Sequence, residues 1–100
     1  IDNMVPEEYT LSQNYPNPFN PVTEIRYSLP EKSDVRITVY NMLGQRVKTL
    51  VQMKQAAGTH TVNWNGTNDR GDEVSSGVYF YRLEAPGTDR QLVRKMILLR

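Results

Sequence analysis

Cysteine is absent from the 100-residue sequence, and histidine occurs only once, as His60. The lack of cysteine excludes disulfide bonds, cysteine-based zinc sites and a thiol nucleophile. Charge of one sign is also lacking, because 12 Lys and Arg residues face 11 Asp and Glu residues. The resulting net charge of +1 predicts no electrostatic attraction to nucleic acid. No run of about 18 apolar residues is present, so we expect a chain that does not span a membrane.

Helical patterning is missing as well, since no segment has the apolar spacing of an amphipathic helix. Apolar and polar residues instead alternate in 25–29 and 35–39, which is typical of half-buried strands. Further short strands are predicted at 46–53, 60–64, 78–84 and 91–99. Gly, Pro and Asn turns separate these segments. The pattern predicts an all-β fold, an immunoglobulin-like or fibronectin-like antiparallel β-sandwich of about seven strands.

The N-terminal part differs in composition from the rest. Residues 1–13 are polar and without a period, and the chain begins at Ile1 rather than Met, so we expect a linker tail of a larger parent protein. Three prolines lie between residues 16 and 21, which excludes a helix or a central strand there. We therefore predict an extended arm at 14–23, held by Tyr15 and Phe19, followed by the sandwich at 24–100.

Polar loop residues suggest a metal site that the spacing does not support. The loop at 65–73 is rich in Asn, Asp and Gly, but it lacks the alternate acids and closing Glu of an EF-hand-like calcium loop. We favour a turn, because Asn and Asp bond to their own backbone there. His60 has no evident nucleophile to activate, and Ser75-Ser76-Gly77 is no nucleophile elbow. We expect no enzyme, no catalytic residue, no metal and no cofactor.

Aromatic residues leave two interpretations open. In the segment 78–84 we place Tyr79, Tyr81 and Leu83 inward, since this leaves Arg82 in solvent. The opposite orientation of this strand would bury Val78 and Phe80 instead. Separately, the aromatic rings either pack in the core or form an exposed platform on which sugars stack, as in a carbohydrate-binding module. The rings available for either role are Trp64, Tyr27, Tyr40, Tyr79 and Tyr81.

Several short motifs in a fixed order resemble a known family from Leu11 to Arg100. They include the Asn14–Pro21 arm, Val39-Tyr40-Asn41 followed by Gly44, and Ser76-Gly77-Val78-Tyr79. The residues that we expect to maintain the motif structure are Asn17, Pro18, Phe19, Trp64, Gly66, Asp69, Gly71, Gly77 and Tyr79. In these features the chain is similar to the C-terminal sorting domains of type IX secretion cargo (Por secretion type A). Those domains are related to the immunoglobulin-like domain of the flagellar hook-capping protein.

The resemblance implies transport rather than chemistry. It implies a non-catalytic domain at 14–100 that directs a covalently attached cargo through the outer membrane of a Gram-negative bacterium, by way of the periplasm, to the medium or the cell surface. It implies the outer-membrane secretion translocon and a sortase-like peptidase as partners. Two alternatives remain: a structural module of the hook-capping or scaffold type, and a carbohydrate-binding accessory module of a secreted hydrolase.

The end of the last predicted strand is our candidate partner-binding segment. It carries apolar side chains and three positive charges, and an open strand edge can accept a partner strand. The candidate residues are Arg94, Lys95, Met96, Ile97, Leu98, Leu99 and Arg100.

Overall fold

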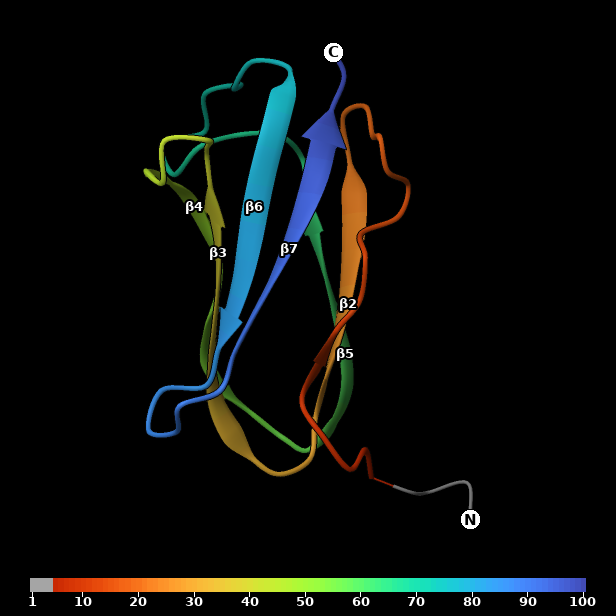
Figure 1. The fold of residues 1–100 in the computed structure, drawn as a ribbon, viewed down its shortest axis with the longest axis vertical. Coiled ribbons are helices and arrows are strands. Elements are labelled where there is room, and N and C mark those ends of the chain that lie inside the picture. Colours follow the sequence, from red (N-terminus) through yellow and green to blue (C-terminus); the bar gives the residue numbers. More distant parts are fainter. Residues whose placement is uncertain (1–4) are drawn as a thin grey trace.

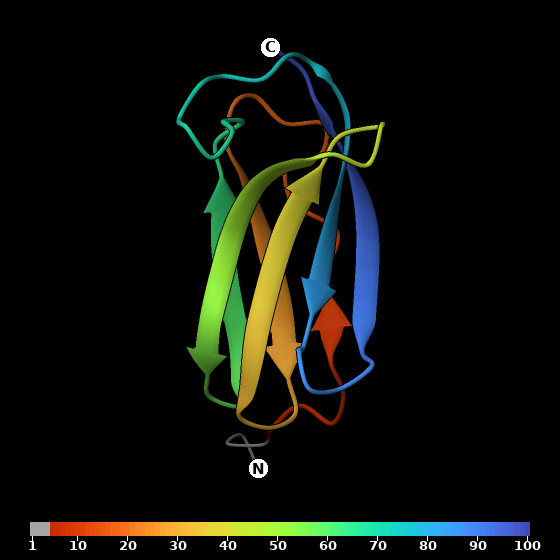
Figure 2. The same ribbon diagram turned by 90° about the vertical axis from the view of Figure 1, so that its left-hand side faces the viewer.

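Seven strands form two antiparallel sheets that pack face to face in the computed structural model, which describes residues 5–100 (Figure 1). One sheet has the order β1-β2-β5 and the other the order β4-β3-β6-β7, and Figure 2 shows β3 and β4 in front of β2 and β5. The strands are β1 (Thr10–Leu11), β2 (Thr23–Leu29), β3 (Ser33–Tyr40), β4 (Arg46–Gln55), β5 (Gly58–Trp64), β6 (Gly77–Glu84) and β7 (Gln91–Leu98). The predicted immunoglobulin-like β-sandwich is confirmed. Residues 5–100 contain no helix of the length and apolarity that crossing a membrane requires.

The core lies between the sheets and follows the alternation of the sequence. In β2, Ile25 and Leu29 are 0% exposed, while Arg26 between them faces solvent. In β6 the inward placement of Tyr79, Tyr81 and Leu83 is confirmed, since all three are buried. Burying a large apolar side chain contributes roughly 1.5–3 kcal/mol, so the two facing apolar surfaces hold the layers together.

The sandwich begins earlier than predicted, before both the start of the arm at residue 14 and the start of the sandwich at residue 24. Thr10 and Leu11 form β1, which pairs antiparallel with Ser28 and Tyr27 of β2, and the Leu11 side chain is buried in the core. The prediction of a linker tail over 1–13 is therefore wrong for 10–11, where one buried leucine is enough to add an edge strand. Residues 1–4 of that predicted tail lie outside the described part of the chain.

Candidate functional site: the N-terminal arm on the last strand

The free edge of β7 is covered by the N-terminal arm, so the expectation of an open edge is wrong. The Phe19 amide donates to the Ile97 carbonyl at 3.0 Å, and the Leu99 amide donates to the Phe19 carbonyl at 2.9 Å. Asn17 Oδ1 accepts a further hydrogen bond from the Ile97 amide at 2.9 Å. These bonds use the backbone groups that a partner strand would need. We call the contact between residues 11–19 and 94–99 the arm–β7 clasp.

Phe19 inserts the arm into the core. Its ring is 2% exposed and lies 5.6 Å from the Trp64 ring, measured between centroids. Trp64 also packs edge-on against Tyr79 at 5.3 Å, and its indole Nε1 donates to the Thr67 carbonyl. Three of the predicted motif residues therefore form one aromatic cluster. Tyr15, the other predicted contact of the arm, holds it through its backbone, which exchanges two hydrogen bonds of 2.9 Å with Glu24, while its side chain is exposed.

Tyr81 holds the other end of the arm. Its hydroxyl donates to the Ser12 carbonyl at 2.7 Å and accepts from the Asn14 amide at 2.8 Å. The Asn14 side chain is buried and donates to Thr23 Oγ1, and Arg94 Nε donates to the Leu11 carbonyl at 2.6 Å. Burial raises the pKa of Tyr81 to about 12, while the Asn14 amide and the Arg94 charge act in the opposite direction. The phenol is thus kept neutral where it meets the arm.

We expect the stability of the fold to decline in strong alkali because of Tyr81. The folded-state pKa lies above the ordinary value of 10.0, so the stabilisation is complete below pH 10 and is lost as the pH rises toward 12. A shift of this size corresponds to about 3 kcal/mol. Burial also raises the pKa of Tyr27, which adds to the same decline. Urea unfolding between pH 8 and 12 measures it, using ~1 pH-unit steps across the titration.

Tyr81→Phe separates the tyrosine from general alkaline effects. The variant should be less stable at pH 8 by about 1–3 kcal/mol, because the buried Asn14 amide loses its acceptor. It should also lose less stability than the parent chain above pH 10. Parallel stability curves for the two proteins would contradict the role given to this hydroxyl.

Arg100 fastens the end of the chain to the loop between β5 and β6. Its amide donates to Ser76 Oγ at 2.8 Å, its Nε donates to the Val74 carbonyl at 2.6 Å, and its guanidinium lies 3.7 Å from Glu73. A second guanidinium nitrogen donates to the Gly66 carbonyl. Gly66 has a φ of +75°, and a Cβ there would lie 2.7 Å from that nitrogen. The positive φ at 66 therefore favours glycine, and a Cβ there would displace the end of the flexible Arg100 side chain.

The loop at 65–73 is folded as the predicted turn. Asn68 Oδ1 accepts hydrogen bonds from the Arg70 and Asp72 amides, and the Gly71 amide donates to the Asn68 carbonyl. Asp69 Oδ1 accepts from the Thr49 amide and so joins the loop to β4. The predicted oxygen-bearing residues thus serve the backbone. Within residues 5–100, no three His, Cys, Asp or Glu side chains gather as metal ligands.

The remaining residues of the predicted motif set lie along the arm and at the start of β6. Asn17 binds β7 directly, Pro18 lies exposed beside it, and Gly77 opens β6 opposite Leu98.

The seven residues of the candidate partner-binding segment do not share one role. Met96 and Leu98 are 0% exposed and belong to the core. Arg94 contacts the arm, and Arg100 contacts the loop between β5 and β6. The side chains left for a partner are those of Lys95, Ile97 and Leu99. Sequence reasoning missed Asn14 and Tyr81, because a hydrogen bond across 67 residues leaves no local signal.

The exposed aromatic platform is not formed. The rings of Trp64, Tyr27, Tyr79 and Tyr81 are at most 6% exposed, so these four residues pack in the core and offer no stacking surface. Only Tyr40 of the predicted set is partly exposed, and Arg82 lies over its ring.

Together, the two sheets, their strand order and the inward-facing aromatic cluster define an immunoglobulin-like module. Residues 20–89 match the FlgD Ig-like domain family, and the chain belongs to this family. The arm before residue 20 and the whole of β7 lie outside that match. No curated protein matches the sequence significantly.

Three solved structures resemble the fold. Dimeric latent PorU from Porphyromonas gingivalis has 21% identity and a TM-score of 0.74, over 99% of this chain and 10% of that chain. PorZ from the same organism is described as an essential surface component of the type IX secretion system. It has 20% identity and a TM-score of 0.60, over 92% of this chain and 11% of that chain. FlgD from P. aeruginosa has 22% identity and a TM-score of 0.61, over 76% of this chain and 60% of that chain. This chain therefore spans about a tenth of PorU and of PorZ.

Proposed function

We propose that the chain is a non-catalytic sorting domain that directs an attached cargo protein across the outer membrane through type IX secretion. The observation that carries the proposal is the arm–β7 clasp. Its two halves flank residues 20–89, the part that matches the FlgD Ig-like family, and the similarity to PorU extends over both. The arm covers the edge of β7, which is the outer strand of the four-stranded sheet, and we assign the sorting function to the contact between the two.

The partners proposed are the outer-membrane secretion translocon and a sortase-like peptidase, with the cargo ending in the medium or on the cell surface. The likeness to PorZ, a surface component of that secretion system, supports this environment. A folded domain is recognised through its surface, and β7 with the residue after it contributes Lys95, Ile97 and Leu99 to that surface. Recognition would therefore require the strand to be held in place by the arm.

An export assay tests the proposal. A periplasmic reporter is joined to the N-terminus of this chain in a bacterium that has a type IX secretion system, and in a strain that lacks the translocon. The reporter should reach the medium or the cell surface in the first strain and remain periplasmic in the second. Lys95→Glu should reduce export and Lys95→Arg should preserve it, because the lysine is exposed and makes no ion pair within the described residues. Circular dichroism confirms that each variant is folded.

A structural module of the hook-capping type is the second candidate, and membership of the FlgD Ig-like family favours it. A reporter that stays in the periplasm of both strains would reject sorting and leave this candidate.

A further inference from the structure

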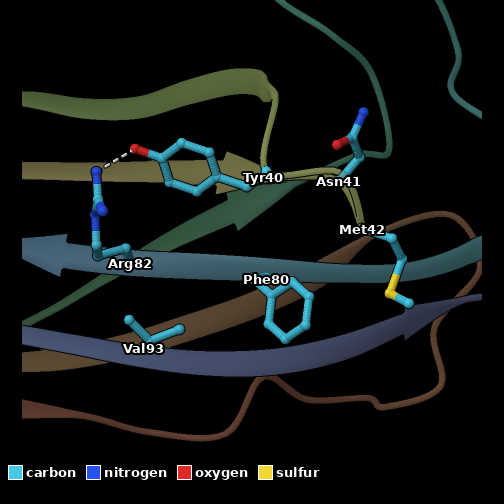
Figure 3. Close-up of a pocket in the computed structure, with 7 residues that line it drawn as sticks. Tyr40, Asn41, Met42, Phe80, Arg82 and Val93 are labelled. Carbon is cyan, nitrogen blue, oxygen red and sulfur yellow. Dashed lines mark hydrogen bonds between the residues drawn. The ribbon is translucent and has the colours of Figure 1, made fainter.

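The outer face of the four-stranded sheet carries a shallow apolar hollow near the turn between β3 and β4. The hollow has a volume of about 260 Å³, and Figure 3 shows its side chains gathered on one side of the sheet. We call it the outer-face patch; it is lined by Tyr40, Asn41, Met42, Phe80, Arg82 and Val93. None of these residues belongs to the arm–β7 clasp.

The patch exposes large apolar side chains on a rigid support. Met42 is 67% exposed, Leu43 beside it 82% and Val93 57%. Turn tips are usually polar, but here Asn41 Oδ1 accepts hydrogen bonds from the Leu43 and Gln45 amides and fixes the tip. A fixed apolar tip loses little conformational entropy when a partner covers it. The contact of these apolar side chains with water is unfavourable, and a bound partner would remove it.

Positive charge borders these apolar side chains. Arg82 lies over the Tyr40 ring at 4.8 Å, and its buried Nε has no hydrogen-bond partner among the described residues. Glu84 is shared between Arg82 at 3.6 Å and Arg36 at 2.9 Å, so one carboxylate faces two guanidinium groups. Lys95 lies opposite Phe80 in the register of β6 and β7 and adds another cation to this face. The patch is therefore complementary to an acidic segment that also has apolar side chains.

The clasp determines how a partner approaches. Because Asn17 and Phe19 occupy the upper edge of β7, a partner strand cannot pair with the backbone there. The sheet face next to that edge remains accessible through its side chains (Figure 3). A partner that binds this face would therefore contact side chains of the sheet and would not add a strand to it.

We propose that the outer-face patch binds an acidic, apolar segment of a polypeptide of the secretion machinery. The inference rests on the proposed sorting function and names a second surface for it, beside the exposed side chains of the clasp, with Lys95 shared by both. Apolar side chains of the partner cover Met42, Phe80 and Val93, and its carboxylates pair with Arg82 and Lys95.

Aspartate substitutions in the export assay test the patch. Met42→Asp and Val93→Asp each place a carboxylate in the apolar surface, and each should reduce export by about tenfold while leaving thermal unfolding nearly unchanged. Met53→Asp is the matched control, since Met53 is 59% exposed and lies outside the patch. If the unaltered fusion is not exported, the sorting function fails. If it is exported and Met42→Asp is exported equally well, the patch proposal fails.

Direct binding gives a second readout. A short peptide of alternating Leu and Glu is titrated into the isotopically labelled chain, with a peptide of alternating Leu and Lys as control. The acidic peptide should shift the amide resonances around Met42, Phe80 and Val93, and the basic peptide should not. Equal shifts with both peptides, or shifts confined to another face, would overturn the proposal. So would a dimer in sedimentation that Met42→Asp dissociates, since the occupant would then be a second copy of the chain.

Discussion

Replacing Phe19 with Ala is expected to lower the free energy of unfolding by about 3–5 kcal/mol. The ring is 2% exposed and fills the space beside Trp64, so its removal leaves a cavity as well as losing buried apolar area. The loss is a large part of the roughly 5–15 kcal/mol that stabilises a typical domain. It should also release the arm, because Phe19 provides the main apolar contact of residues 12–20. Urea unfolding measures the loss of stability. Limited proteolysis measures the release of the arm, as the rate at which residues 12–20 are cleaved.

Tyr15→Ala is the matched control for Phe19→Ala. Both residues are aromatic and lie on the same arm, but Tyr15 is 79% exposed and its ring contributes little burial. We expect the free energy of unfolding of Tyr15→Ala to stay within about 0.5 kcal/mol of that of the parent chain. Equal losses in the two variants would mean that the arm depends on local stiffness rather than on the contact between Phe19 and Trp64.

Leu98→Ala is expected to destabilise the fold by about 2–5 kcal/mol and to abolish export with it. Leu98 is 0% exposed, pairs with Gly77 in the sheet and forms a bridge with Phe19 of the arm. The variant therefore weakens both the core and the clasp. Chemical unfolding gives the stability, and the reporter assay gives the export.

Leu99→Ala separates the core from the surface at the end of the chain. Leu99 is the next residue and of the same type, but it is 53% exposed, so its truncation should change stability by less than about 1 kcal/mol. A loss of export in this folded variant would assign Leu99 to the partner contact. A loss of stability as large as that of Leu98→Ala would contradict the assignment of the two leucines to different environments.

The strands β2 to β7 were predictable because their information is local, whereas β1 was missed. Alternation in 25–29 and 35–39 identifies β2 and β3, and the position of Arg82 was enough to orient β6 correctly. The loop at 65–73 was predictable for the same reason, since Asn68 bonds to amides two and four residues away.

The clasp was not predictable because its contacts are not local. The bond between Asn14 and Tyr81 spans 67 residues, and the one between Asn17 and Ile97 spans 80. A proline-rich segment has no period that would reveal which strand it accompanies. The sequence therefore indicated an ordered arm held at Tyr15 and Phe19 but left the edge of β7 open.

The pairing of Phe19 with Leu98 has a consequence for biosynthesis. The arm is translated before β7, and its hydrogen bonds to Ile97 and Leu99 cannot form until the ribosome has made those residues. A nascent or truncated chain would leave the Phe19 and Trp64 rings exposed to chaperones and proteases, as partly folded domains do. Native structure around Phe19 thus reports that translation has passed Leu99, so products that stop before this residue are distinguishable from longer ones by their exposed arm.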